Sequence, residues 1–269
     1  MKKLMTLALC LMASVTMIAQ SQRTVNVIAG GLGQALGPSK MSVTHLKITG
    51  EINGDDVRVL REMCGASGLL QDLDLSEVRI VNGGGRYFEG TTQDCYTHRN
   101  QITAHMFYNC SMLQRITLPD KTRSISHDAF SNCPNLREFR TTANCTKYTA
   151  VEGILYTADR ETLVRCPEGL PLDEVEVTDG VHHIYTGAFY NYSKLRQVVL
   201  PSTIESVSNK AFIGCPLQSI MIRAKRAPAM ENAFDASVVS NATLYIPRGS
   251  RESYMSANFW NKFSHMQEF

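Results

Sequence analysis

The chain repeats one arrangement of apolar and polar positions about every 23 residues. Each copy starts at an Ala-Phe or Met-Phe pair, passes through a polar turn and reaches a leucine five or six residues after the phenylalanine. The phenylalanines of the four clear copies are Phe107, Phe130, Phe189 and Phe212, and Phe234 follows 22 residues after the last of them. A fixed period of this length predicts an array in which each repeat forms one turn of a solenoid.

A short strand is expected after each phrase, because apolar residues alternate there with polar ones. The strand positions on the apolar face are Leu113, Ile116 and Leu118; Leu136, Phe139 and Thr141; Leu195, Val198 and Leu200; and Leu217, Ile220 and Ile222, of which only Thr141 is polar. Alternation with period two places these side chains on one face of a strand. A single repeat has nothing to cover that face. Stacked repeats therefore bury one another's apolar side chains, each worth about 1.5–3 kcal/mol, and align their strands as a parallel sheet.

The repeated phrase has the form A-F-x-x-C-x-x-L-x-x-I-x-L-P, and on these residues the chain resembles the BspA-like leucine-rich-repeat family of bacterial surface and secreted proteins. The resemblance covers roughly residues 48–269. Tyr192 stands at the cysteine position, Met106 at the alanine position, and one residue is missing between Cys215 and Leu217. The resemblance implies a β-rich (α+β) solenoid, a right-handed superhelix with a parallel sheet on one face and a cap at each end.

Residues 1–19 have the pattern of a secretory signal peptide. Lys2 and Lys3 are followed by an apolar stretch to Ile18, and Ala19 precedes the expected cleavage site. No second stretch approaches the roughly 20 apolar residues that a membrane-spanning helix needs. We therefore expect an exported protein, in the periplasm, on the cell surface or secreted, without a transmembrane segment.

Residues 20–101 are expected to form an N-terminal cap and the first repeat strands. Leu46–Ile48 predicts a strand, and Asp55 and Asp56 are expected to cap a helix of about ten residues. The glycine-rich stretch 30–37 lacks the G-x-G-x-x-G spacing of a nucleotide-binding loop, so it predicts a turn and a short helix. Residues 82–101 form a long polar loop, which we interpret either as a contact surface or as a cover for the solenoid edge.

Residues 102–240 are expected to hold the repeats, with a hairpin inserted at about residues 151–167. The hairpin explains why Phe130 and Phe189 are 59 residues apart. Residues 241–269 predict a C-terminal cap, in which a helix starts at Ser250 and the sole tryptophan, Trp260, closes the end of the core.

The composition excludes several classes of partner and site. Lys and Arg number 27 against 25 Asp and Glu, so nothing favours nucleic acid or an anionic membrane. Seven cysteines lie beyond the predicted signal, without a C-x-x-C spacing. Cys110, Cys133 and Cys215 share one repeat position and are expected to pack as small buried side chains, whereas a disulfide such as Cys145–Cys166 stays open.

No candidate catalytic, metal or cofactor site emerges from the sequence. None of the seven histidines has an H-x-x-x-H spacing, and no G-x-S-x-G motif is present. Asp72 and Asp74 form a carboxylate pair, but alternation puts both on the solvent side of a strand. We therefore expect a protein without enzymatic activity.

The outward positions of the repeat strands remain as the candidate binding surface. They are Asp72, Asp74, Arg115, Thr117, Glu138, Arg140, Gln197, Val199, Ser219 and Met221. Charges of both signs and few aromatic side chains favour a protein partner, and solenoids present extended binding surfaces.

The family's known members include adhesins, so the resemblance implies adhesion to a host matrix protein or a bacterial surface protein. Two alternatives stay open: a secreted hydrolase or glycan-binding protein, and a passive structural spacer. A hydrolase predicts that histidine or carboxylate side chains converge in a pocket.

Overall fold

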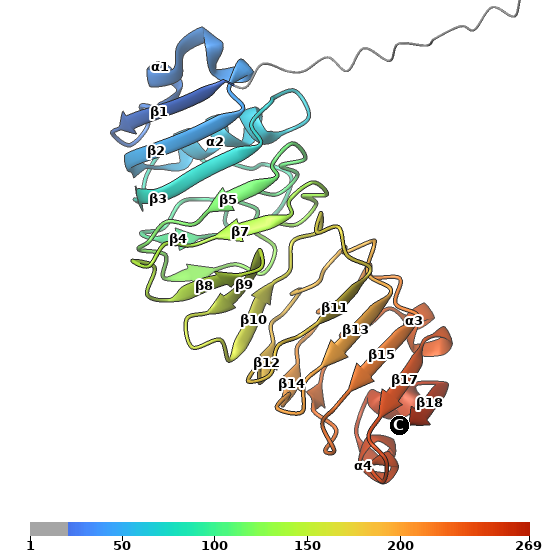
Figure 1. Cartoon of the computed structure of the whole chain (residues 1–269). Helices are drawn as coiled ribbons and strands as arrows, with labels where there is room; N and C mark the ends of the chain where they lie inside the picture. The colour runs from blue at the N-terminus through green and yellow to red at the C-terminus, as the bar shows by residue number, and fades with distance from the viewer. Residues whose placement is uncertain (1–20) are drawn as a thin grey trace, which may run out of the picture.

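The computed structural model describes residues 21–269, so the predicted signal peptide lies outside the described residues. The chain forms an elongated stack of coils that runs from the N-terminal cap to the C-terminal cap (Figure 1). Two strand layers follow the length of the stack, and the helices gather at its two ends. The predicted β-rich repeat solenoid with parallel strands on one face is confirmed.

The main face of the stack consists of two five-stranded parallel sheets. The first holds β1 (Gln22–Val27), β2 (His45–Ile52), β3 (Asp72–Ile80), β5 (Arg115–Thr117) and β7 (Glu138–Arg140). The second holds β11 (Glu174–Glu176), β13 (Gln197–Leu200), β15 (Ser219–Ile222), β17 (Thr243–Ile246) and β18 (His265–Glu268). The parallel face is therefore interrupted once, between β7 and β11.

A second layer of short strands lies on the other side of each coil. It contains β4 (Gln101–Ile102) with β6 (Ser124–Ile125), and β12 (His183–Ile184) with β14 (Ser206–Val207) and β16 (Ala229–Met230). The last three continue into β10 (Thr162–Arg165), β9 (Ile154–Thr157) and β8 (Tyr148–Val151). The helices are α1 (Leu32–Leu36), α2 (Gly54–Cys64), α3 (Ala236–Asn241) and α4 (Arg251–Ser256), with 3-10 turns at Gly37–Ser42 and Trp260–Lys262.

The predicted helix of the N-terminal cap is α2, and its apolar side faces the core through Val57, Leu60 and Met63. The sequence predicted Asp55 and Asp56 as the capping residues, but the N-cap is Asn53. The Asn53 side chain accepts a hydrogen bond from the helix, and Asp56 accepts one from the Asn53 N–H. Asp56 thus closes a capping box, which satisfies N–H groups that the first helical turn leaves unpaired.

The repeat phenylalanines form two stacks and not one column. Phe107 and Phe130 are parallel, with ring centroids 5.3 Å apart. Phe189, Phe212 and Phe234 form the second stack at 4.7 and 5.0 Å. The buried side chains likewise divide into two clusters, one for each half of the chain. The division occurs where the repeat spacing lengthens between residues 130 and 189.

A three-stranded antiparallel meander occupies this interruption. β9 and β10 form the expected hairpin around Asp159 and Arg160, but the sequence missed β8 and assigned residues 151–156 to one strand. A turn at Glu152 and Gly153, with φ of 51° and 81°, separates β8 from β9. Two consecutive positive φ values suit a two-residue hairpin turn, and a glycine fits there without strain.

The C-terminal cap closes the second core cluster, as the position of the sole tryptophan predicted. Trp260 and Tyr254 are fully buried. The Trp260 indole donates to the Pro228 carbonyl at 2.7 Å, and the Tyr254 hydroxyl donates to the Ala224 carbonyl at 2.8 Å. Each polar tip is thus satisfied while its ring packs on the core, as burial of these residues requires.

Replacement of Phe212 by alanine should destabilise the second half of the stack. The Phe212 ring is fully buried and packs against a ring on each side, so its removal leaves a cavity that costs about 3–5 kcal/mol. Urea unfolding monitored by circular dichroism measures the loss. Tyr185→Ala is the control, because that ring is 40% exposed and its removal should cost little. Equal midpoints for the two variants would contradict the stacking argument.

Candidate functional site

Six of the ten predicted surface residues line up on the face of the first sheet. The register places Asp72, Arg115 and Glu138 in one row across β3, β5 and β7, and Asp74, Thr117 and Arg140 in the next row. All six are partly exposed. Strand alternation therefore brings the first-sheet residues together as the sequence predicted.

The charged members of this group pair with one another. Asp72 accepts a hydrogen bond from Arg115 Nε at 2.7 Å and lies 3.4 Å from Arg140 Nη1. Arg140 also forms a two-point contact with Glu138, at 2.7 and 2.9 Å. These hydrogen bonds from Arg140 hold the pKa of Glu138 below its usual range. The first-sheet face is thus a lattice of alternating charges whose side chains are held in place.

The lattice extends toward the N-terminal cap through Lys47 on β2. Its ammonium lies 2.5 Å from Glu77 Oε1 and 3.9 Å from Asp74 Oδ2. The hydrogen bond to Glu77 raises the pKa of Lys47 above its usual value. Because these groups are exposed, the pairs contribute little to stability, and their main effect is on the charge pattern of the face.

The other four predicted residues lie on the second sheet, and all four are uncharged. Gln197 accepts a hydrogen bond from Ser219 Oγ at 3.0 Å and donates one to Glu174 at 2.8 Å. Val199 and Met221 are register partners in the neighbouring row. The predicted binding positions thus fall into two chemically different groups on two sheets.

Val199 is not available as a binding residue, because it is only 4% exposed. It points away from the core, as alternation predicted, but a long-range ion pair crosses its strand. Arg223, directly after β15, lies 2.6 Å from Glu176 on β11, and β13 with Val199 is the strand between them. Strand alternation predicted the direction of the Val199 side chain, but it did not predict that neighbouring side chains would bury it.

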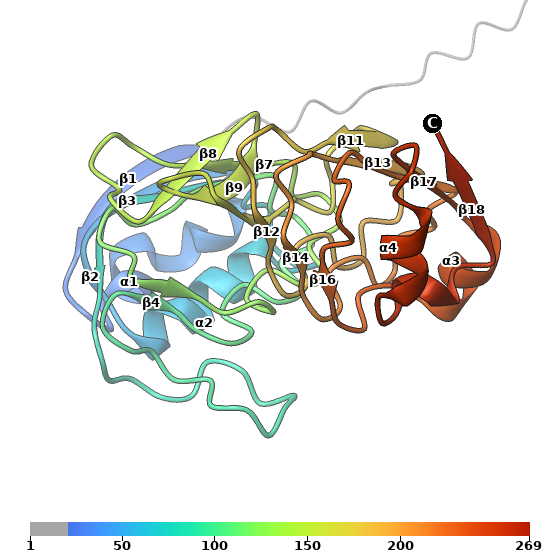
Figure 2. The ribbon, with the colours of Figure 1, turned by 90° about the horizontal axis from the view of Figure 1, so that it is seen from below.

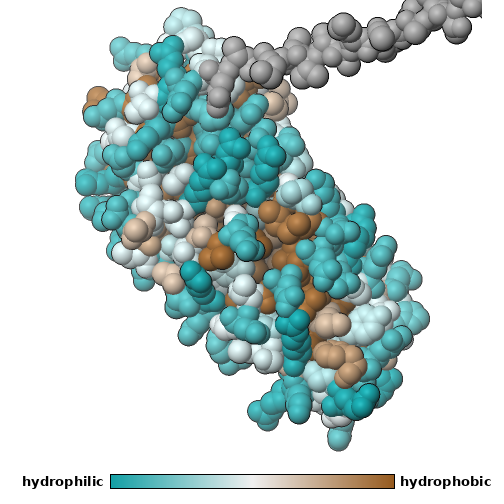
Figure 3. Space-filling view, viewed as in Figure 1, coloured by the Kyte–Doolittle hydropathy of each residue, from teal (hydrophilic) through white to brown (hydrophobic). Residues whose placement is uncertain are grey.

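The interruption between the two sheets forms a shallow notch of about 410 Å³ on the same face. Arg137, Glu138 and Arg140 line one side of it, and Glu152 and Pro171 line the other. Figure 3 shows apolar side chains gathered at the middle of this face, between the two sheets. The strand face is therefore a charged half and a less charged half separated by a notch.

The turn edge of the stack carries a second kind of surface that the sequence analysis missed. A hollow of about 690 Å³ follows the asparagine of each repeat phrase, with Asn109, Asn132 and Asn191 along its wall and Gly214 at the equivalent place. All four have φ between 59° and 78°, as a left-handed turn requires. The fixed asparagine position in the repeat was the available signal.

A smaller hollow of about 360 Å³ adjoins the first, and Asn132 lines both. Its walls come from the repeat turns and from the long loop between β3 and β4, which contributes Thr91 and Gln93. The loop projects from the body of the stack (Figure 2). The loop thus covers part of the solenoid edge and lines a hollow, and its role as a contact surface stays a prediction.

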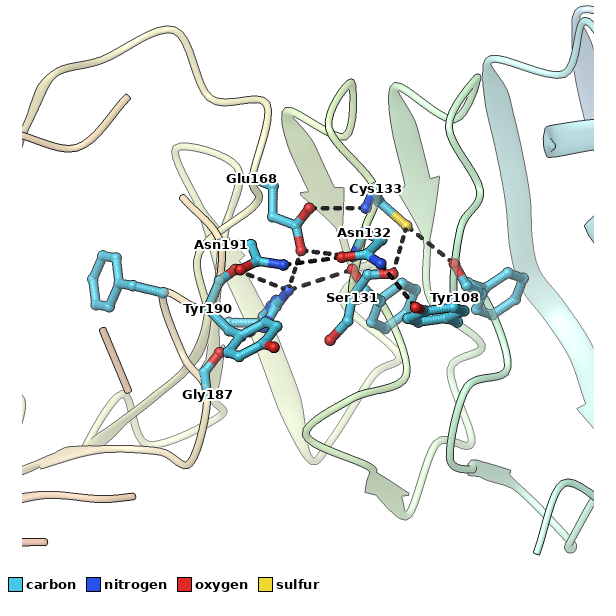
Figure 4. A network of polar contacts seen from close by, with 12 residues as sticks. Tyr108, Ser131, Asn132, Cys133, Glu168, Gly187, Tyr190 and Asn191 are labelled. Carbon is cyan, nitrogen blue, oxygen red and sulfur yellow. Dashed lines mark hydrogen bonds and ion pairs between the residues drawn. The ribbon is translucent and has the colours of Figure 1, made fainter. Parts of the chain in front are cut away.

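A buried ion pair joins the two halves of the stack beside these hollows (Figure 4). Arg165 and Glu168 are 4% and 6% exposed, and Arg165 Nη2 lies 2.8 Å from Glu168 Oε1. The Glu168 carboxylate accepts hydrogen bonds from the backbone N–H groups of Asn132 and Cys133, at 3.0 and 2.9 Å. Arg165 also donates to carbonyls on both sides, including those of Phe130 and Gly187.

Arg165 replaces a hydrogen bond that the regular repeats make with cysteine. The Cys133 thiol donates to the Phe107 carbonyl at 3.0 Å, and the Cys215 thiol donates to the Phe189 carbonyl at 2.9 Å. The corresponding carbonyl of Phe130 instead receives Arg165 Nη2 at 3.4 Å. Side chains of the ion pair thus take over contacts that the interrupted repeat does not provide.

The repeat cysteines are buried, unpaired thiols. Cys110, Cys133 and Cys215 are at most 1% exposed, as expected for small packed side chains. Burial raises the pKa of Cys215 to about 12 and that of Cys133 well above its usual value, so both stay protonated. Cys145 and Cys166, which the sequence left open as a pair, are both free.

Three polar groups do converge in the smaller hollow. His105, His127 and Asp128 line it, and His105 Nδ1 lies 3.4 Å from Asp128 Oδ2. Nucleophilic catalysis also needs a nucleophile hydrogen-bonded to the base. Among residues 21–269, neither imidazole of this hollow has a serine, threonine or cysteine as a hydrogen-bond partner. Within that part of the chain, the hollow thus holds two imidazoles and a carboxylate without a hydrogen-bonded nucleophile beside them.

In the glycine-rich stretch of the cap, backbone N–H groups donate hydrogen bonds to the side chain of Asp56. Asp56 is 1% exposed, and its carboxylate accepts hydrogen bonds from the N–H groups of Gly30 and Leu32, at 2.6 and 2.9 Å. These are the donors that a phosphate-binding loop would offer to an anion. The turn and the short helix α1 at Leu32–Leu36 agree with the sequence prediction.

The buried ion pair should make stability depend on pH. Burial raises the pKa of Glu168 to about 7 from the ordinary 4.5, against the opposing effects of Arg165 and the backbone N–H groups. The folded state then binds this proton more tightly than the unfolded state, so the free energy of unfolding falls as pH rises from about 4.5 to about 7. We expect Glu168→Gln to flatten this decline in urea midpoints measured between pH 4.5 and pH 8. An unchanged slope would contradict the assignment.

Replacement of Arg165 tests the same pair from the other side. In Arg165→Met the Glu168 carboxylate loses its partner while the side chain keeps a similar length. Removing one member of a buried pair costs about 3–5 kcal/mol because an uncompensated charge stays inside. We expect the double variant Arg165→Met/Glu168→Gln to be more stable than Arg165→Met alone at pH 8. A double variant no more stable than the single one would show that the two residues act independently.

The repeat family can be identified from the sequence of this chain. Six copies of the BspA-type leucine-rich repeat region match residues 89–150 and 166–263, more than half of the 269 residues. The gap in the match falls within the β8–β10 meander. No curated protein matches the chain.

Several solved structures are similar to this one in fold. The pneumococcal vaccine antigen PcpA has 14% identity and a TM-score of 0.48, and the match covers 83% of this chain and 62% of the antigen. A leucine-rich-repeat protein from Eubacterium ventriosum has 14% identity and a TM-score of 0.43, with 79% and 68% covered. A leucine-rich cell surface protein from Faecalibacterium prausnitzii has 17% identity and a TM-score of 0.42, with 91% and 78% covered.

The phrase pattern, the stacked coils and the six matched repeats all lead to one assignment. The match indicates no catalytic family. The chain belongs to the family of proteins with BspA-type leucine-rich repeats.

Proposed function

We propose that this protein is an exported, non-enzymatic leucine-rich-repeat protein that mediates protein–protein interaction or adhesion at the bacterial cell surface. Leucine-rich-repeat proteins bind proteins, and the family match is consistent with such a role. The partner in this proposal is a host matrix protein or another bacterial surface protein. The passive spacer is the alternative that a binding measurement separates from it.

The charge lattice on the first sheet is the observation that carries the proposal. Asp72, Arg115, Glu138 and Arg140 are held by one another at hydrogen-bond distance, yet each stays partly exposed. Side chains that are already ordered lose less conformational entropy when a partner binds. A fixed pattern of both charges favours a protein with the complementary pattern and raises the rate of association.

Export rests on the sequence pattern of residues 1–19 and on the family. Signal-like charge and hydropathy precede the repeats, and BspA-type repeats match over the stack. In the described part of the chain, no helix has the length and apolar character needed to cross a bilayer. The predicted signal and the family match support a protein that works outside the cytoplasm.

Charge reversal on the first sheet tests the proposed binding surface. We expect Arg115→Glu/Arg140→Glu to weaken binding to a purified matrix protein by about tenfold, equivalent to roughly 1.4 kcal/mol. Binding of the purified protein to a panel of immobilised extracellular-matrix proteins, followed by surface plasmon resonance, provides the measurement. Higher salt should also slow association of the unmodified protein, because the steering charges are exposed.

Arg223→Glu is the matched control, because it breaks an exposed ion pair on the second sheet. It should leave binding unchanged, and thermal melting should show that all variants are folded. Equal binding of the double variant and the unmodified protein would exclude the first-sheet face. A folded protein that binds no member of the panel would favour the spacer.

A further inference from the structure

The smaller hollow on the turn edge has a lining that is almost entirely polar. Its volume of about 360 Å³ is at the lower end of the range of ligand pockets, about 300–1,000 Å³. The residues that matter here are Gln93, His127, Asp128, Asn132, Tyr190 and Lys210. Of all the residues that line it, Gly187 alone lacks a polar side chain. Apart from ring faces, the hollow thus offers an apolar peptide side chain little to pack against.

Two tyrosine rings contribute the only large carbon surfaces of the hollow. Tyr108 and Tyr190 occupy the same place in two repeat phrases, one in each half of the stack. In Figure 4 the two rings lie on opposite sides of Ser131. Both rings are half-buried, and each hydroxyl can donate and accept hydrogen bonds. The Tyr108 ring already packs against Phe88 and His105, with centroids 5.4 and 4.9 Å away, so Tyr190 is the ring that would stack on a ligand.

The polar groups of the hollow are already positioned. Asn132 Nδ2 donates to the Tyr108 hydroxyl at 2.8 Å, and Asn191 Nδ2 donates to Asn132 Oδ1 at 2.9 Å. Asp128 Oδ1 accepts from Ser126 Oγ at 2.6 Å, while its other oxygen lies 3.4 Å from His105 Nδ1. Each carboxylate oxygen accepts more than one hydrogen bond, so Asp128 keeps capacity for a ligand hydroxyl.

The asparagine row extends this arrangement into the larger hollow through the shared residue Asn132. The row needs glycine at position 214, because a Cβ there would lie 2.4 Å from Asn191 Oδ1. Amide groups that offer both a donor and an acceptor thus continue along the turn edge for more than one repeat. The combined hollows suit a ligand with repeated hydroxyl groups and a length beyond one ring.

From this geometry we propose that the turn edge is a glycan-binding site, with one sugar ring in the smaller hollow and the next along the asparagine row. Sugar hydroxyls use both donors and acceptors, and the carbon face of a sugar ring packs on tyrosine. The charges of Asp128 and Lys210 oppose each other, so the hollow favours neither a strong anion nor a cation. The site lies on the turn edge and is separate from the charged strand face.

Binding to defined glycoconjugates tests the proposal. Serum albumin carrying galactose, mannose, N-acetylglucosamine or sialic acid oligosaccharides is immobilised, with unmodified albumin as the blank, and the purified protein is measured by surface plasmon resonance. At least one conjugate should bind saturably. Tyr190→Ala and Asp128→Asn should each weaken that binding by about three- to tenfold, the range expected for one aromatic or hydrogen-bond contact.

Tyr185→Ala is the matched control, because Tyr185 is an exposed tyrosine near Tyr190 in sequence that does not line the hollow. It should bind as the unmodified protein does, and melting curves should show that all variants fold. Asp128→Asn keeps the side-chain shape and serves where Tyr190→Ala reduces folding. Absence of binding above the albumin blank, or equal binding by all variants, would overturn the proposal. The proposal would also be overturned if the protein bound peptides on an array, lost that binding in Tyr190→Ala and Asp128→Asn, and bound none of the glycans.

Discussion

Stacking of the coils is the constraint on which this structure depends. Each coil exposes apolar side chains and backbone donors and acceptors that only a neighbouring coil can cover. The meander formed by β8, β9 and β10 interrupts the regular stacking of coils, and both the phenylalanine stack and the core divide there. The Arg165–Glu168 pair bridges the division, since its carboxylate and guanidinium replace backbone and cysteine partners of the regular repeats.

The free-energy cost of burying two charges at this joint explains the many hydrogen bonds around the Arg165–Glu168 pair. A buried ion pair recovers its desolvation energy only when additional hydrogen bonds satisfy both partners. Here Glu168 accepts two backbone N–H groups, and Arg165 reaches carbonyls on either side of the interruption. Directly after Glu168, the backbone at Gly169 lies close to the backbone at Pro134. Only glycine fits there, because a Cβ would lie 2.7 Å from the Pro134 carbonyl oxygen. These polar contacts thus add to the apolar side chains of the meander, such as Leu155 and Val164, in holding the two halves together.

The interruption also divides the outer surface by chemistry. The first sheet carries ordered charges, the second sheet carries amides, hydroxyls and apolar side chains, and a notch separates them. The turn edge carries a polar hollow that draws residues from both halves and from the long loop. A protein partner on the strand face and a glycan on the turn edge therefore make different demands, and the two proposals stand or fall separately.

The sequence determined the repeat, the parallel strands, the α2 helix and the sealing role of Trp260, because periodic apolar residues have one way to be buried together. Alternation also placed Asp72, Arg115, Glu138 and Arg140 on one face. Only the tertiary structure decided that Val199 is covered, that two sheets replace one, and that Arg165 pairs with Glu168. Those outcomes depend on contacts between residues that are far apart in the chain, which local periodicity does not specify. The turn-edge hollow belongs to the same class, since its residues come from several coils and a loop.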